Sequence, residues 1–165
     1  MKKYVFKPYS ERFPELFERE KARIYPALEG FAIEHVGSTA VPGLGGKGII
    51  DIAIGAGREE FERVKAELVR LGYEFRPSFS SAERLYFVAF LPDDEEGTRR
   101  YHAHVVEPEG VEWRQLVGFR DYLRSHPEEA REYAEIKKAA ALEADEDGKK
   151  YRKLKERAFK KFTRE

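Results

Sequence analysis

Two apolar segments on either side of a glycine-rich loop constrain the fold of this chain more than any other feature. The first segment, AIEHV, spans Ala32 to Val36, and the second, GIIDIAI, spans Gly48 to Ile54. Each is short and bounded by turn-forming residues, and each therefore predicts a strand. The loop between them consists mostly of small residues, with one Pro and one Lys.

The rest of the pattern predicts helices and strands within one domain. Apolar spacing predicts a helix from Ser10, its N-terminal cap, to about Leu28, and an amphipathic helix from Arg58 to Leu71. Further strands are expected at 73–76, 84–91 and 101–107, and further helices at about 112–124, 127–143 and 147–162. No repeat or linker divides the 165 residues. We therefore expect one α+β domain, with a five-strand mixed sheet, one crossover helix and a helical C-terminal lobe.

The composition limits the functional classes open to the chain. Lys and Arg number 31 and Asp and Glu number 31, which argues against a nucleic-acid partner because phosphate neutralisation supplies most of that affinity. The chain has no Cys, which excludes disulfides and cysteine metal ligands. No apolar run matches a membrane span or the core of a signal peptide. We therefore expect a cytoplasmic protein without a membrane partner.

Asp51 is the one acid within the second apolar segment. Its neighbours Ile49, Ile50 and Ile52 are apolar, so its carboxylate is expected to be partly desolvated. A carboxylate in that position needs a metal, an arginine or a hydrogen-bond donor as its partner.

The glycine-rich loop begins with Gly37, Ser38 and Thr39, directly after the first strand. Glycine and serine at such a turn let the backbone approach a ligand and expose N–H groups that can hold phosphate oxygens. We therefore assign these three residues to phosphate binding. Lys47, in the same loop, either contacts phosphate as well or is simply solvated.

Several motifs resemble a known family. Gly-Ser at 37–38, followed after twelve residues by Asp51, resembles the signature of the nucleotidyltransferase superfamily. More narrowly, IEHVGSTAVPGL and K-x-IIDI resemble the GrpB-like family, as do HAHVVE at 102–107, W-x5-FRDYLRSHP at 113–127, and Y-x3-K at 151–155. These motifs follow one another over most of the chain, so no single short motif carries the resemblance. The family pattern usually has Pro at the position of Gly48, which implies a softer exit from the loop here.

The resemblance implies a nucleotidyltransferase-like fold, in which the Gly-Ser turn holds a triphosphate and divalent metals assist phosphoryl transfer. In that superfamily two acids, one residue apart on the next strand, bind metal. Here the first is Asp51, the expected catalytic acid, and the second position is Ala53.

Three functions follow from this incomplete pattern. The first is an enzyme that binds a nucleoside triphosphate with Mg²⁺, Mn²⁺ or Zn²⁺ and transfers a nucleotidyl or phosphoryl group to a small acceptor. The second is a module that binds a nucleotide or another phosphorylated metabolite without turnover. The third is an interaction protein in which the motif is only a structural loop. The GrpB-like family itself has no firmly assigned reaction.

His102 and His104 lie two residues apart on a predicted strand and therefore share one face. With Asp51 nearby they would supply three ligands to a divalent metal, and zinc or another transition metal would suit them better than magnesium because imidazole is a soft ligand. The alternative, which we favour slightly, is a pair of half-buried histidines bonded to backbone or to a carboxylate. His35, alone at a strand end, either orients the loop or contacts a ligand.

Two pairs of residues with helical spacing are further candidates for substrate contacts. Arg120 and Arg124 share a helix face, which either clamps an anion or pairs with the Glu-rich helix after Pro127. Tyr151 and Lys155 would contact a nucleotide base and a phosphate respectively, or else pack against the sheet.

Arg99 and Arg100 follow the acidic segment PDDEE. Because the chain has no Asn, one Gln and abundant charge, a composition typical of thermophilic proteins, we expect many of its charges to form surface ion pairs. We assign this arginine pair to a surface ion-pair cluster.

Overall fold

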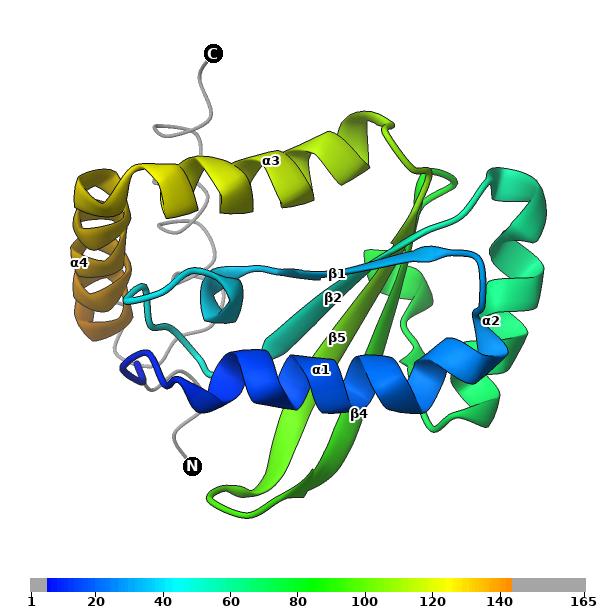
Figure 1. Cartoon of the computed structure of the whole chain (residues 1–165), viewed down its shortest axis with the longest axis horizontal. Coiled ribbons are helices and arrows are strands. Elements are labelled where there is room, and N and C mark those ends of the chain that lie inside the picture. Colours follow the sequence, from blue (N-terminus) through cyan, green and yellow to red (C-terminus); the bar gives the residue numbers. More distant parts are fainter. Residues whose placement is uncertain (1–5, 144–165) are drawn as a thin grey trace.

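A computed structural model of the chain describes residues 6–143, and the side chains of residues 6–139 (Figure 1). The helix predicted at 147–162, and with it the substrate contacts assigned to Tyr151 and Lys155, lies outside the described residues.

A five-stranded mixed sheet forms the centre of the described chain. Its strands are β1 (Ala32–Val36), β2 (Ile50–Gly55), β3 (Glu74–Phe75), β4 (Arg84–Asp93) and β5 (Gly97–Val106). Their spatial order is β1-β2-β5-β4-β3. β2 and β5 run parallel, whereas every other neighbouring pair is antiparallel. The expected α+β class and mixed sheet are therefore confirmed.

Four α-helices accompany the sheet in the described residues: α1 (Arg12–Ile24), α2 (Phe61–Arg70), α3 (Val111–Ser125) and α4 (Pro127–Glu143). The Ser10 hydroxyl accepts a hydrogen bond from the backbone N–H of Arg12 at 3.1 Å, but the N-cap position of α1 is Glu11, one residue later than predicted, and it has no side-chain capping bond. α1 ends at Ile24, earlier than predicted, because Pro26 continues the chain as a short 3-10 turn.

Strand alternation sends apolar and polar side chains to opposite faces of the sheet. The apolar face packs against α1 and α2 (Figure 1), and its core includes Phe13, Phe17, Ile50, Ile52, Ile54, Val64, Leu68, Ala103 and Val105. The second face carries the residues of opposite parity, among them Asp51, Ala53, His102 and His104.

The helices α3 and α4 hold the glycine-rich loop from the other side. α3 crosses the sheet opposite α1 (Figure 1) and contacts β1 and β2. A second, smaller core joins these two helices to the loop and consists of Val41, Leu44, Leu123, Ala130 and Tyr133. Within residues 6–143, no helix combines the length and the apolar composition needed to cross a membrane.

Candidate functional site

Three predicted residues, Asp51, His102 and His104, meet on the second face of the sheet. Asp51 and His102 lie directly opposite one another on the parallel strands β2 and β5. The Oδ1 atom of Asp51 lies 3.1 Å from Nε2 of His104 and 3.4 Å from Nδ1 of His102. One carboxylate oxygen is thus shared by two imidazoles.

These contacts set the ionisation of the cluster. Burial raises the pKa of Asp51, but hydrogen bonds from His102 and His104, together with their charge, outweigh burial and hold the pKa below its ordinary value. Burial lowers the pKa of His102, against the opposing effect of Asp51. Asp51 is therefore an ionised acceptor of hydrogen bonds between two imidazoles.

His102 has partners on both of its nitrogens. Arg100 Nε donates to His102 Nε2 at 2.7 Å, and the Tyr86 hydroxyl lies 2.6 Å from Nδ1. Because a guanidinium can only donate, Nε2 is the acceptor and Nδ1 carries the proton of the neutral ring. Burial and then the Asp51 charge raise the pKa of Tyr86 to about 12, so its hydroxyl stays protonated at neutral pH.

The assignment of Arg99 and Arg100 to a surface ion-pair cluster is wrong in both cases. Arg99 is buried, where it binds Asp93 through two nitrogens and the Gly48 carbonyl through a third. Arg100 is exposed and, within the described chain, has His102 and the Phe90 ring as partners rather than a carboxylate.

The three candidate metal ligands come together, but they do not form a ready metal site. Among residues 6–143, no group of three or more His, Asp or Glu side chains could hold a metal ion as placed. The strand neighbour of Ala53 is Glu34, whose carboxylate is paired with Arg120 at 2.8 Å. The Glu34 carboxylate is therefore engaged by Arg120 rather than offered beside Asp51 as a further ligand.

The turn after β1 presses against Asp51. Gly37 has φ 77°, in the left-handed region, and a Cβ atom placed on it would lie 2.5 Å from Asp51 Oδ2. Only glycine fits there without displacing the carboxylate. Ser38 begins the 3-10 turn that follows, and no hydrogen bond to its hydroxyl is found within the described chain.

Thr39, assigned to phosphate binding, makes hydrogen bonds within the protein instead. Its hydroxyl is buried, donates to the Ile49 carbonyl at 2.9 Å and lies 2.9 Å from His35 Nε2. Because that hydroxyl proton is already donated, Nε2–H of His35 donates to the hydroxyl oxygen. The His35 ring also stacks on Phe17 of α1, with ring centroids 4.8 Å apart. His35 therefore orients the loop.

His35 should make the stability of the protein depend on pH. Burial, followed by the charges of Arg124 and Arg120, lowers the pKa of His35 to about 4, against the opposing effect of Asp51. The unfolded chain takes up a proton near pH 6.5, but the folded chain does not until about pH 4. The contribution of neutral His35 to the free energy of unfolding is therefore complete above pH 6.5. It falls by roughly 1.4 kcal/mol for each pH unit as the pH is lowered from 6.5 to about 4. Chemical denaturation at several pH values measures it.

His35→Gln should show a shallower pH dependence than the wild type over the same interval. His126 is exposed, and His126→Gln, the matched control, should keep the wild-type slope. Equal slopes for wild type and His35→Gln would contradict a neutral, buried His35.

Arg120 and Arg124 bind the backbone on both sides of the turn. Arg120 Nη1 donates to the His35 carbonyl at 2.9 Å, and Arg124 Nε donates to the Ala40 carbonyl at 2.8 Å. Neither pairs with the described side chains of α4, so that alternative is wrong for residues 127–139. The two arginines position the turn from α3.

Lys137 is a site residue that the sequence analysis missed. Its side chain is only 3% exposed, and Nζ lies 3.5 Å from the Gly45 carbonyl. A Cβ atom on Gly46 would lie 2.7 Å from Ser38 Oγ and 2.8 Å from Lys137 Nζ, so both polar groups approach the bare glycine. Helical spacing could have identified it, because Lys137 shares a face with the buried Ala130 and Tyr133. Lys47, the lysine that we predicted, is half-buried.

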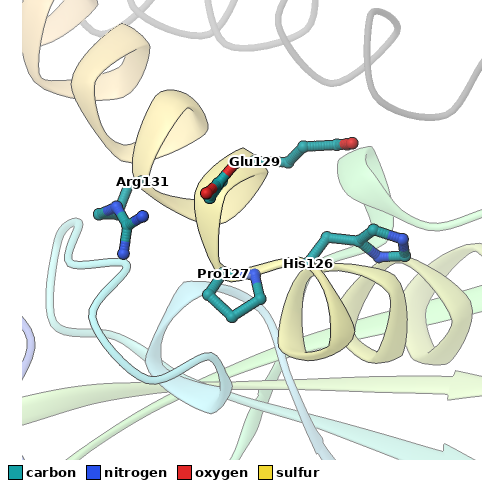
Figure 2. Close-up of a pocket in the computed structure, with 5 residues that line it drawn as sticks. His126, Pro127, Glu129 and Arg131 are labelled. Atoms are coloured by element: carbon teal, nitrogen blue, oxygen red, sulfur yellow. The ribbon is translucent and has the colours of Figure 1, made fainter.

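A separate pocket lies where α3 meets α4. It has a volume of about 450 Å³ and is lined by His126, Pro127, Glu128, Glu129 and Arg131. Figure 2 shows the lining side chains as sticks. The pocket contains none of the predicted site residues.

Comparison with known proteins gives consistent matches. A family model described as GrpB protein matches residues 3–165. A UPF0157 protein of Pseudomonas aeruginosa is 43% identical over 148 residues, which are 87% of this chain and 60% of that protein. The UPF0157 protein YqkA of Bacillus subtilis is 34% identical over 139 residues, 82% of this chain and 39% of that protein. The chain thus spans less than two thirds of either relative. The crystal structure of the conserved protein GrpB from Enterococcus faecalis superposes with a TM-score of 0.75 at 28% identity, covering 96% of this chain and 99% of that one.

Proposed function

The chain belongs to the GrpB family, and from that premise we propose that it binds a nucleoside triphosphate or another phosphorylated small molecule and transfers a nucleotidyl or phosphoryl group to a small acceptor. Family membership assigns no reaction, so the proposal rests on the site. It includes a nucleotidyltransferase type of fold, which the Gly-Ser turn and the acid on the following strand favour.

The observation that carries the proposal is the pair of polar groups at Gly46. The Ser38 hydroxyl and the buried Lys137 ammonium both approach the Cα atom of this glycine. A hydroxyl donor beside a desolvated cation suits phosphate oxygens, because charge-assisted hydrogen bonds are strong away from water. Lys47, in the same loop, would add a second cation.

Gly37 connects this phosphate position to Asp51. Its bare Cα atom lies between the Ser38 turn and the Asp51 carboxylate. A phosphate held at Ser38 would therefore be separated from Asp51 and its two histidines only by Gly37. This arrangement favours group transfer next to the polar face of β2 and β5.

The proposal assigns no step to a metal, because the described residues do not fit one as placed. Binding of Mg²⁺, Mn²⁺ or Zn²⁺ by Asp51, His102 and His104 stays a prediction. Asp51 Oδ1 lies 3.1 Å from His104 Nε2 and 3.4 Å from His102 Nδ1, so the three candidate ligands are at least close together.

A non-catalytic module for the same ligands is the second candidate. Ala53 is fully buried, and its neighbour Glu34 is paired with Arg120. Without a second acid, two metals about 4 Å apart have no shared ligand set. This feature favours ligand binding without turnover.

Nucleotide binding is tested by thermal unfolding with ATP, with other nucleoside triphosphates and with inorganic diphosphate. A ligand at a hundred times its Kd should stabilise the protein by about 2.7 kcal/mol, or about 5–10 °C in Tm. Ser38→Ala should weaken binding about tenfold, because it removes a charge-assisted hydrogen bond. Product analysis then separates the enzyme from the binding module.

Ser78 offers a matched control, since it is exposed and lies outside the site. Ser78→Ala should bind like the wild type. No stabilisation by any phosphorylated ligand, or equal affinities for the two serine variants, would remove the phosphate site from the turn.

A further inference from the structure

We infer that His104 is the general base of this site and that Asp51 orients it. The inference rests on the proposed function for the identity of its substrate, an acceptor hydroxyl. The two nitrogens of the His104 ring differ in their surroundings.

Nε2 of His104 lies 3.1 Å from Oδ1 of Asp51. Asp51 is ionised and can only accept, so Nε2 carries the hydrogen in this contact. In the neutral ring the other nitrogen, Nδ1, therefore holds a lone pair. Asp51 thus selects one tautomer of His104.

Nδ1 of His104 is buried and has no hydrogen-bond partner in the described chain. A buried acceptor without a partner destabilises the folded protein, and such groups call for an explanation. His102, two residues away on the same face, has partners on both nitrogens. Only His104 of this pair offers an unused lone pair.

An ionised carboxylate on one imidazole nitrogen and a free lone pair on the other form a proton-accepting dyad. The carboxylate fixes the tautomer and stabilises the imidazolium that forms. In the proposed transfer, Nδ1 takes the proton of the acceptor hydroxyl, and the oxygen of that hydroxyl bonds to the α-phosphorus of the nucleoside triphosphate. The bond from that phosphorus to the bridging oxygen breaks, and diphosphate leaves with the electron pair.

The acceptor must reach a nitrogen that is closed to solvent as placed. Tyr86 packs edge-on against His104, with ring centroids 5.2 Å apart, and lies directly opposite it on β4. Because Tyr86 is a ring packed on His104, a shift of side chains around this ring is what the inference requires for the acceptor hydroxyl to reach Nδ1.

The same geometry separates a base from a metal ligand. A metal shared with Asp51 would need the lone pair of Nε2, whereas the dyad has a hydrogen there. The proton position is measurable by ¹⁵N NMR of the histidine side chains at neutral pH, without any activity. We expect the Nε2–H tautomer for His104 in the wild type, and loss of that preference in Asp51→Asn.

Zn²⁺ is the probe for the competing assignment. Displacement of the Nε2 hydrogen of His104 by stoichiometric Zn²⁺, seen in the same spectra, would overturn the base. An Nδ1–H tautomer in the metal-free protein would also overturn it.

The kinetic test compares His104→Gln with His102→Gln, which alters the neighbouring imidazole. His104→Gln should lower kcat at least a hundredfold and leave the ATP-induced shift in Tm unchanged. His102→Gln should lose less activity. Turnover by His104→Gln at the wild-type rate would overturn the inference. It would also be overturned if the wild type binds ATP and has the expected tautomer but transfers no group. If the protein has the expected tautomer but binds no phosphorylated ligand, the proposed function is contradicted, whereas the assignment of the Asp51–His104 dyad is not.

Discussion

Gly37→Ala is expected to lower the free energy of unfolding by about 4 kcal/mol. Two effects add. Alanine is strained at φ 77°, and its Cβ atom would lie 2.5 Å from Asp51 Oδ2. The carboxylate cannot easily withdraw, because His102 and His104 both hold it. Urea denaturation of the two proteins measures the difference.

Gly43 separates the two effects. It also has a positive φ, of 81°, but a Cβ atom there would meet nothing within 4 Å. Gly43→Ala should therefore lose only the conformational part, about 1 kcal/mol. In a double-mutant cycle, Gly37→Ala should cost less free energy of unfolding in an Asp51→Ala background than in the wild type, and the difference is the steric part of its effect. Equal losses for the two glycine variants would show that the turn does not press on Asp51.

The second large effect is expected for Arg99→Leu, at about 3–5 kcal/mol. Arg99 is buried and paired with Asp93, which its two nitrogens bind at 3.1 and 3.2 Å. Removing the guanidinium leaves a buried carboxylate with less compensation, and it leaves the Gly48 carbonyl without the donor that lies 2.8 Å away. Denaturation at neutral pH is again the measurement.

The adjacent arginine is the matched control. Arg100 is exposed, and its described partners are His102 and Phe90, so Arg100→Leu should lose about 1 kcal/mol or less. Adding Asp93→Asn to Arg99→Leu should recover part of the loss, because it removes a buried charge that has lost its main partner. A loss below 1 kcal/mol for Arg99→Leu would mean that the buried pair does not hold the loop.

Both predictions concern the frame of the same loop. Gly37 fixes where the loop begins, against Asp51, and Arg99 holds its exit through Gly48. Arg124 adds a third contact at Ala40. Side chains held on such a frame lose little freedom on ligand binding, which favours a preformed site.

The existence and the faces of the strands follow from local sequence, but not all of their boundaries do, because β5 begins at Gly97, before the predicted start at 101. β1 lies at Ala32–Val36, as predicted from its apolar pattern. His102 and His104 were expected to share one face of a strand, because the period of two residues along a strand needs no knowledge of distant contacts. The glycines of the loop predicted close approach of the backbone to a ligand, whereas the approach that the structure shows is that of Gly37 to the Asp51 side chain.

The pairing of strands and the partners of the charged side chains required the folded chain. Nothing local indicates that β5 lies beside β2, with β4 beyond it, because strand order depends on packing across the whole sheet. The same holds for Lys137, which comes from α4 to Ser38 and Gly46, and for Arg100, which binds an imidazole where a carboxylate was expected. Periodicity along the chain decides which way a side chain points, whereas the group it meets is set by long-range packing.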